Sequence, residues 1–215
     1  MNRTASCVVL LLLGAAVVKV CLTGQYLRYV KAGLWPFLLL SGVVVVVLAV
    51  ANRHRQPRVA WLLVLPVVAL VVVAPQPLGS YAAGNSGTAL VESDEYPPLP
   101  GGDPVRVTVL DYASRAVFDE GRSLGGRRVV LTGFVARGPG GENLLVRMIL
   151  TCCAADGRPV KVVLDGVVPA EPDTWVEVVG TYRAGSVVDG VNGERIPFLA
   201  VESVKVVPEP QRPYE

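Results

Sequence analysis

Two adjacent cysteines and a nearby carboxylate are the side chains of this sequence best suited to chemistry. Residues 151–156 read Thr-Cys-Cys-Ala-Ala-Asp and follow an apolar run that is typical of a strand. Cysteine thiolates favour soft transition metal ions, and a carboxylate can complete such a ligand set. The sequence therefore suggests a transition metal site made of Cys152, Cys153 and Asp156.

The spacing of these residues leaves other interpretations open. Neighbouring side chains on a strand point to opposite faces, so both thiols reach one ion only where the strand ends or bulges. The chain has one histidine, His54, far from the cysteines in sequence, so imidazole ligands are not expected near them. The pair could instead serve thiol redox chemistry, although the Cys-x-x-Cys spacing is missing, or it could be buried in the core.

Few other residues suggest catalysis. The sequence has no phosphate-binding glycine-rich loop that ends in Lys-Ser or Lys-Thr, and it lacks a second histidine. We therefore predict that the protein is not an enzyme. Four carboxylates of the C-terminal half could bind a hard cation, but we interpret them as solvated. They are Asp165, Glu171, Asp173 and Glu177.

The charged residues divide the chain into two different parts. The first 79 residues carry seven basic and no acidic residues, whereas the remainder carries 13 basic and 18 acidic residues, a net charge of −5. An acidic region is a poor match for phosphate binding, which needs clustered Lys and Arg. We therefore expect no nucleic-acid partner, and we predict an apolar N-terminal part followed by a soluble domain.

Three apolar runs in the N-terminal part have the length of membrane-spanning helices. They cover residues 5–22, 34–51 and 59–78, near the about 17 to 25 residues that cross a hydrocarbon core. We predict a transmembrane helical module at residues 1–78, embedded in the lipid bilayer of the cell membrane. A signal peptide is the alternative for the first run, although no convincing small-residue cleavage pattern follows it.

Basic residues predict the orientation of this module. Arg53, Arg55 and Arg58 crowd the connection between the second and third runs, and Arg3 lies near the N-terminus. The positive-inside rule places these residues in the cytoplasm. With three spans, the chain after residue 78 emerges on the outer face, so we predict a multi-pass protein with an extracytoplasmic C-terminal domain.

The rest of the chain reads as a linker, a mainly-β domain and a tail. Residues 79–104 are rich in Gly, Ser, Pro and acid, which predicts a flexible linker, and residues 208–215 form a Pro-rich tail. In the domain at residues 105–207 we expect a strand at 105–110 and an amphipathic segment with Asp111 as its N-cap. Five further strands are predicted at 128–136, 144–151, 160–164, 175–182 and 198–207. Short strands with turn residues between them favour an OB-like barrel, with a small sandwich as the alternative.

Several motifs of the chain resemble those of the DUF1980 family. Besides residues 151–156, they are Asp-Thr-Trp-Val-Glu-Val-Val-Gly at 173–180, Pro-Phe-Leu-Ala at 197–200 and Pro-Tyr-Glu at 213–215. The resemblance extends over the whole chain in layout. It implies an accessory membrane protein, the smaller subunit of a two-component permease, which works beside a larger polytopic permease subunit.

We accordingly expect an accessory permease subunit whose outer β domain assists or senses a solute, with a transition metal ion as the candidate. Small residues on the first two runs are expected to allow close packing against the partner. They are Gly14, Ala15, Ala16, Ser41 and Gly42. One alternative is a stand-alone, membrane-anchored metal-binding or thiol-redox protein, and another is a structural envelope protein.

Overall fold

The computed structural model describes residues 3–51 and 77–215, which form two compact units. One unit contains the N-terminal helices together with Cys152–Ala154, and the other contains Leu78–Thr151 and Ala155–Glu215. The third predicted span, at residues 59–78, lies almost entirely outside the described residues.

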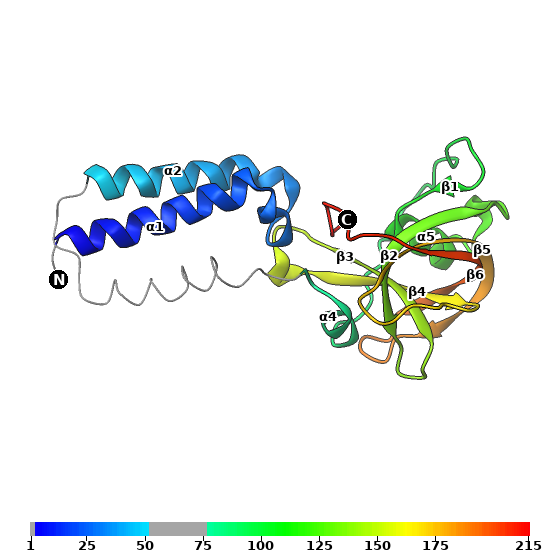
Figure 1. The fold of residues 1–215 in the computed structure, drawn as a ribbon. Coiled ribbons are helices and arrows are strands. Elements are labelled where there is room, and N and C mark those ends of the chain that lie inside the picture. The colour runs from blue at the N-terminus through cyan, green and yellow to red at the C-terminus, as the bar shows by residue number, and fades with distance from the viewer. Residues whose placement is uncertain (1–2, 52–76) are drawn as a thin grey trace. The chain divides into compact units, whose positions relative to one another are not determined.

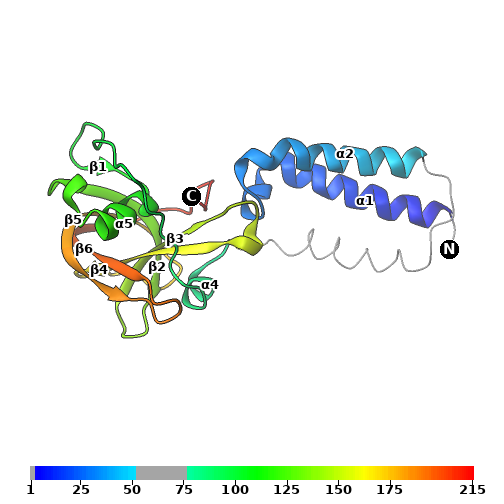
Figure 2. The same cartoon turned by 180° about the vertical axis from the view of Figure 1, so that it is seen from behind.

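Two apolar helices, α1 (Arg3–Leu22) and α2 (Trp35–Ala51), form the N-terminal unit. Short 3₁₀ turns at Gln25–Arg28 and Ala32–Leu34 connect them, and the helices lie side by side in opposite directions (Figures 1 and 2). The valine-rich α2 is helical because a helix satisfies its own backbone hydrogen bonds, which outweighs the preference of valine for strands. Helices therefore occupy the first two predicted spans.

The two helices differ in their suitability for crossing a membrane. The segment Ala32–Ala51 is long and apolar enough to do so, with a mean hydropathy of 2.6. The apolar part of α1, Cys7–Leu22, is shorter. The described residues thus contain one helical segment with the length and composition of a membrane span.

Small residues allow α1 and α2 to approach each other closely. A Cβ atom at Gly14 would lie 2.6 Å from Cγ2 of Val46 and 2.9 Å from the carbonyl oxygen of Gly42, which is too close for non-bonded atoms. Gly14, Gly42 and Ala16 are buried. Ala15 and Ser41 are exposed. The glycines that were expected to pack against a partner protein therefore pack between α1 and α2 instead.

We expect the substitution Gly14→Leu to loosen the helix pair, because the added side chain has no space against Val46 and overpacking costs about 1–3 kcal/mol. Thermal unfolding of the full chain in detergent micelles should show a lower midpoint. The control Ala15→Leu adds the same side chain at an exposed position and should leave the midpoint unchanged. An equal loss in both variants would contradict this packing.

A closed barrel of five strands forms the second unit. The strands are β2 (Val129–Arg137), β3 (Asn143–Ile149), β4 (Arg158–Asp165), β5 (Trp175–Val188) and β6 (Arg195–Val206). Their spatial order is β2-β3-β4-β6-β5, and pairing of β2 with β5 closes the ring. Only the β4–β6 pair of the ring is parallel. This architecture is consistent with the predicted OB-like barrel, and each strand includes most of a predicted one.

The segment before the barrel differs from the prediction. The strand expected at residues 105–110 is limited to β1 (Val105–Arg106), and the helix α5 (Val109–Phe118) starts soon after it. The prediction of Asp111 as N-cap is wrong, because the cap is Thr108, whose hydroxyl accepts a hydrogen bond from the Asp111 N–H at 3.0 Å. Asp111 instead lies in the first helical turn and binds Arg115, 2.9 Å away.

Opposite faces of the strands pack into two different cores. Leu131 and Val135 of β2 lie in the barrel interior, which α5 helps to cover. The alternate residues Phe134 and Ala136 point outward into a second core with the short helix α4 (Ser80–Gly84). Figures 1 and 2 show α4 and α5 at separate places on the barrel. Burial on both faces explains why these strands are nearly continuous apolar runs.

Residues 79–89, here called the strap, are hydrogen-bonded to the barrel although they belong to the predicted linker. At one end, the N–H and the hydroxyl of Ser80 donate to the carboxylate of Asp173 at 2.6 and 2.7 Å. Near the other end, the Thr88 N–H donates to Asp189 at 2.8 Å, and the Ala89 N–H donates to the Pro159 carbonyl at 2.7 Å. The strap is therefore bonded at both ends.

A buried ion pair lies under the strap. Lys161 and Asp189 are each only 4% exposed, and Nζ of Lys161 lies 2.8 Å from Oδ2 of Asp189. The same Nζ donates to the carbonyl of Ser86 at 2.8 Å. Burial alone would raise the pKa of Asp189, but hydrogen bonds from Lys161, Val191 and Thr88 outweigh it and hold this pKa below its ordinary value of 3.8.

We expect Asp189→Asn to lower the free energy of unfolding by about 3–5 kcal/mol near neutral pH, because it leaves the charge of Lys161 buried without its partner. Since folding lowers the pKa of Asp189, the stabilisation is complete above pH 3.8 and is lost as the pH falls through the lower folded-state value. The difference between wild type and variant should therefore shrink in acid.

Urea unfolding of the full chain in micelles at pH 7 and pH 3 measures this effect. The fluorescence of Trp175 can report on the barrel if Trp35 and Trp61 are replaced by Phe. Asp165→Asn is the matched control, because Asp165 pairs with Arg183 at the surface and such pairs contribute about 1 kcal/mol or less. A difference between wild type and Asp189→Asn that is as large at pH 3 as at pH 7 would refute this account.

Candidate functional site

The cysteines lie in the loop between β3 and β4, beyond the end of the ladder. The last paired residues of the two strands are Ile149 and Arg158. The chain bends at Thr151 and Cys152 and then forms a 3₁₀ turn at Ala154–Asp156. Because the strand has already ended, the alternation of side chains no longer forces the two thiols apart. The loop therefore meets the condition that the metal interpretation required.

The three predicted ligands converge in this loop. The Sγ atoms of Cys152 and Cys153 and a carboxylate oxygen of Asp156 all lie within 4.8 Å of one another. Cys152 is exposed, while Cys153 and Asp156 are half-buried. Oδ1 of Asp156 accepts a hydrogen bond from the N–H of Thr151 at 2.9 Å, which stabilises the bend and orients the carboxylate. The loop thus presents two sulfur ligands and one oxygen ligand near solvent.

This donor set is suitable for zinc or another borderline to soft transition metal ion. Tetrahedral zinc has Zn–S bonds of about 2.3 Å, which places two thiolates about 3.8 Å apart. Side-chain rotations that move the ligand atoms by about 1 Å would bring the three atoms into such a geometry. Three protein ligands leave a fourth position open, and an exposed site with an open position can take up and release an ion more readily than a closed structural site.

The backbone of the cysteine loop is tied to the connection between α1 and α2. Within the N-terminal unit, the Lys31 N–H donates to the Cys152 carbonyl at 2.9 Å, and the Ala154 N–H donates to the Tyr29 carbonyl at 2.7 Å. Val30 and Cys153 form an antiparallel bridge between these two bonds. Residues 29–31 therefore fix the backbone that carries both thiols.

The tail at residues 208–215 supports the strand that leads into the loop. Glu215 pairs with β3 through its N–H, which donates to the Met148 carbonyl at 2.9 Å. Its carboxylate accepts the N–H groups of Val109 and Leu110 at the start of α5, each at 3.2 Å. Burial raises the pKa of Glu215, although these N–H groups and Arg147 act in the opposite direction. The Pro-Tyr-Glu motif therefore has a packing role.

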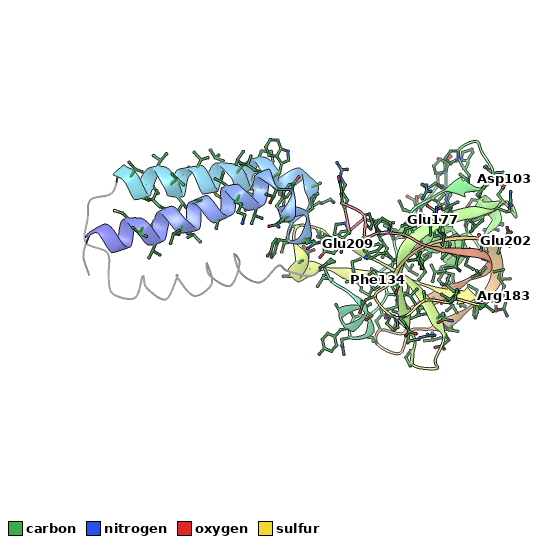
Figure 3. The ribbon with its side chains drawn as sticks, in the orientation of Figure 1. Asp103, Phe134, Glu177, Arg183, Glu202 and Glu209 are labelled. Atoms are coloured by element: carbon green, nitrogen blue, oxygen red, sulfur yellow. The ribbon has the colours of Figure 1, made fainter. Side chains whose placement is uncertain are left out.

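Three of the four carboxylates considered for a hard cation have separate polar partners. Glu177 pairs with Arg106 and Asp165 pairs with Arg183, each at 2.7 Å, and Asp173 binds Ser80 of the strap. Figure 3 shows Glu177 and Arg183 at different places on the barrel. These pairs give no support to a shared cation site among them.

A serine motif was missed at the sequence level. Residues 121–125 read Gly-Arg-Ser-Leu-Gly, which has the spacing of a hydrolase nucleophile elbow. In the structure this stretch follows α5 and forms a 3₁₀ turn at Arg122–Leu124, whereas the elbow needs a strand before the serine and a helix after it. The Ser123 N–H donates to Asp119 at 2.6 Å. The motif therefore belongs to a turn that ends α5.

The buried pair Lys161–Asp189 was also missed. Its signal in the sequence is a lysine in the middle of the apolar run Pro-Val-Lys-Val-Val-Leu at residues 159–164. A lysine there needs a buried partner or an exit to solvent, but the partner lies in another hairpin, far along the chain.

A comparison with protein-family models finds a match for most of the second unit. No curated protein and no solved structure matches the chain. Residues 112–215, which include all five barrel strands and the cysteine loop, match the family model described as the DUF1980 C-terminal domain, and this match supports the resemblance to the DUF1980 family.

Proposed function

We propose that this protein is an accessory membrane subunit of a two-component permease and that its barrel binds a transition metal ion at Cys152, Cys153 and Asp156. The observation that carries the proposal is the convergence of these three ligand atoms to within 4.8 Å in one loop. Two thiolates and a carboxylate select a borderline or soft ion over magnesium or calcium, which prefer oxygen ligands. The ion is the solute that the barrel loads or senses.

The proposed location is the cell membrane, with several spans and the barrel on the outer face. The apolar segment Ala32–Ala51 supports a membrane position. Residues 29–31 are hydrogen-bonded to Cys152–Ala154, so the connection between α1 and α2 lies on the same side of the membrane as the cysteines. This agrees with an orientation in which the basic residues near Arg53 face the cytoplasm. The site then faces the space from which a permease draws or into which it releases solute.

The proposed partner is a larger polytopic permease subunit. Large apolar side chains of α2, among them Phe37, Leu40 and Val47, are more than half exposed, so lipid or another membrane protein must cover them. A protein that needed only an anchor would require a single span. The family resemblance supports the permease as the occupant of this surface.

The alternative of a thiol-redox protein shares the cysteines but differs in chemistry. A redox role needs cycling between two thiols and a disulfide, and adjacent cysteines close only a very small, strained ring. The carboxylate of Asp156 beside the thiols favours the metal interpretation, because it adds an oxygen ligand to the two sulfur ligands. A structural envelope protein would have no need for such a group.

We expect the purified full chain, loaded with zinc and then desalted, to retain about one equivalent of zinc. The double variant Cys152→Ser, Cys153→Ser should retain none, and Asp156→Asn should bind with roughly ten- to a hundredfold lower affinity, because a neutral amide oxygen replaces the charged carboxylate ligand. The measurement is metal content by mass spectrometry together with a competition titration against a zinc chelator.

The matched control is Cys7→Ser, Cys21→Ser, which removes the same number of thiols from α1 and should retain the metal. Circular dichroism should show that all variants keep their secondary structure. Zinc retention in the Cys152, Cys153 double variant, or zinc loss in the α1 control, would contradict the assignment of the metal site to the cysteine loop.

We expect gentle detergent extraction of the native membrane to release this chain together with a larger polytopic membrane protein. Replacing the exposed small residues, in Ala15→Leu with Ser41→Leu, should reduce the recovered partner severalfold, because close helix packing depends on small side chains. Quantitative mass spectrometry of the affinity-purified chain is the measurement. Val47→Leu, which changes an exposed apolar residue only slightly, is the control; purification of the chain alone would exclude a stable permease complex.

A further inference from the structure

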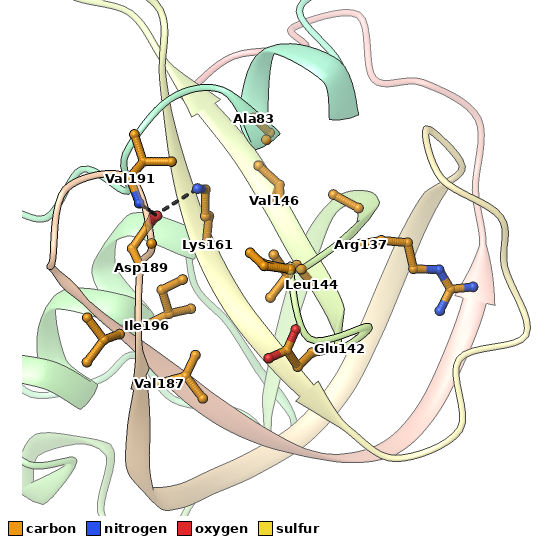
Figure 4. Close-up of a pocket in the computed structure, with 16 residues that line it drawn as sticks. Ala83, Arg137, Glu142, Leu144, Val146, Lys161, Val187, Asp189, Val191 and Ile196 are labelled. Atoms are coloured by element: carbon orange, nitrogen blue, oxygen red, sulfur yellow. Dashed lines mark hydrogen bonds and ion pairs between the residues drawn. The ribbon is translucent and has the colours of Figure 1, made fainter.

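A cavity opens on the outer side of the barrel, between two loops. The loop Gly138–Glu142 follows β2 and borders one side, and the loop Asp189–Val191 follows β5 and borders another, while α4 of the strap contributes Ala83 and Gly84 (Figure 4). Its volume is about 210 Å³. The two loops join the first to the second and the fourth to the fifth strand of the barrel, and OB-like barrels bind their ligands on the face that lies between these loops.

The walls of the cavity are apolar. Side chains from all five strands and from α4 line it, and they include Ala83, Ala136, Leu144, Val146, Val187 and Ile196. An apolar protein cavity of about 150 Å³ is large enough for benzene. On the same scale this cavity takes an apolar group of about eight non-hydrogen atoms. The volume limits the size of the group that can enter the cavity.

The charged groups around the cavity disfavour an anion. Lys161 and Asp189 neutralise each other, with Nζ and Oδ2 at 2.8 Å, and Lys161 also donates to Ser86. The guanidinium of Arg137 points away from the cavity in Figure 4 and binds Asn143. The carboxylate of Glu142 points toward the cavity in the same view. Arg137 keeps its positive charge but is directed away, so the charged group that is directed toward the cavity is the carboxylate of Glu142.

We propose that this cavity is a binding site for a small amine with a compact apolar body. The apolar body fills the space beside Ala136, Val146 and Ile196, where burial of its surface supplies the affinity. The ammonium group lies next to Glu142, near the entrance, where it remains partly hydrated. This site uses none of the cysteine-loop residues, so the proposal can be tested independently of the proposed metal site.

The test uses the full chain in lipid nanodiscs and n-hexylammonium as the probe, followed by ligand-observed NMR with empty nanodiscs as the blank. We expect binding with a dissociation constant of about 1 mM, a strength of the order expected for a ligand of this size. Glu142→Gln should weaken binding about threefold. The control Glu171→Gln removes the same charge at an exposed position outside the cavity and should leave binding unchanged.

Two further comparisons distinguish the cavity from partition into lipid. Ala136→Leu fills the cavity and should abolish the signal, and Val187→Phe does the same from the half-buried rim. On the wild-type chain, n-hexanoate, which has the opposite charge, should bind at least tenfold more weakly than n-hexylammonium. Equal binding of the two probes, a signal no larger than that of empty nanodiscs, or unchanged binding in both filled variants would overturn the proposal.

Discussion

Pairing of β2 with both β3 and β5 is the constraint on which the rest of the barrel depends. Each edge of β2 is used, Phe134 pairing with Val146 on one side and with Trp175 on the other. A strand bonded on both edges and covered on both faces has no exposed backbone edge through which it could aggregate.

The closure of the barrel also needs close backbone approach. A Cβ atom at Gly133 would lie 2.5 Å from the Val146 carbonyl oxygen, and one at Gly180 would collide with the Ala200 carbonyl. Glycine at these two positions lets the strands bend into a ring.

Ring closure decides where the loops with functional potential lie. The β3–β4 ladder ends at Ile149 and Arg158, so the residues between them must leave the sheet, and the Asp156 carboxylate is available to bond the Thr151 N–H. Asp156 therefore has two roles: it accepts this structural hydrogen bond, and it is a candidate metal ligand. The loops after β2 and β5 border another opening, on the outer side of the barrel. The chain therefore carries two chemically different proposed sites, one with sulfur ligands and one with apolar walls.

The strands could be predicted from sequence because each is an apolar run bounded by turn residues, and the two apolar helices because of their length and composition. Local sequence patterns did not predict the structure where a residue far along the chain determines it. Val109 and Leu110 looked like the end of a strand, but the Glu215 carboxylate bonds their N–H groups and the Thr108 hydroxyl caps the helix. Lys161 could be recognised as unusual, while Asp189 could not be identified as its partner, since nothing in the local sequence links β4 to the loop after β5. The candidate ligands were found from residue type alone; their convergence depends on where β3 ends.

The net negative charge of residues 80–215 bears most directly on the apolar cavity, whose lining lies wholly within these residues. A domain with an acidic surplus raises the local concentration of cations over a distance of about 8–10 Å at physiological ionic strength, and it repels anions. An ammonium group at Glu142 is favoured by this field, whereas at the cysteine loop the positive charge of Lys31, whose N–H bonds the Cys152 carbonyl, opposes it. The contact energies remain different in kind: the metal site depends on directional bonds to thiolates, whereas the cavity depends mainly on buried apolar area. High salt should therefore slow capture at the cavity, while the equilibrium affinity at the cysteine loop should depend much more on the protonation of its thiols than on salt.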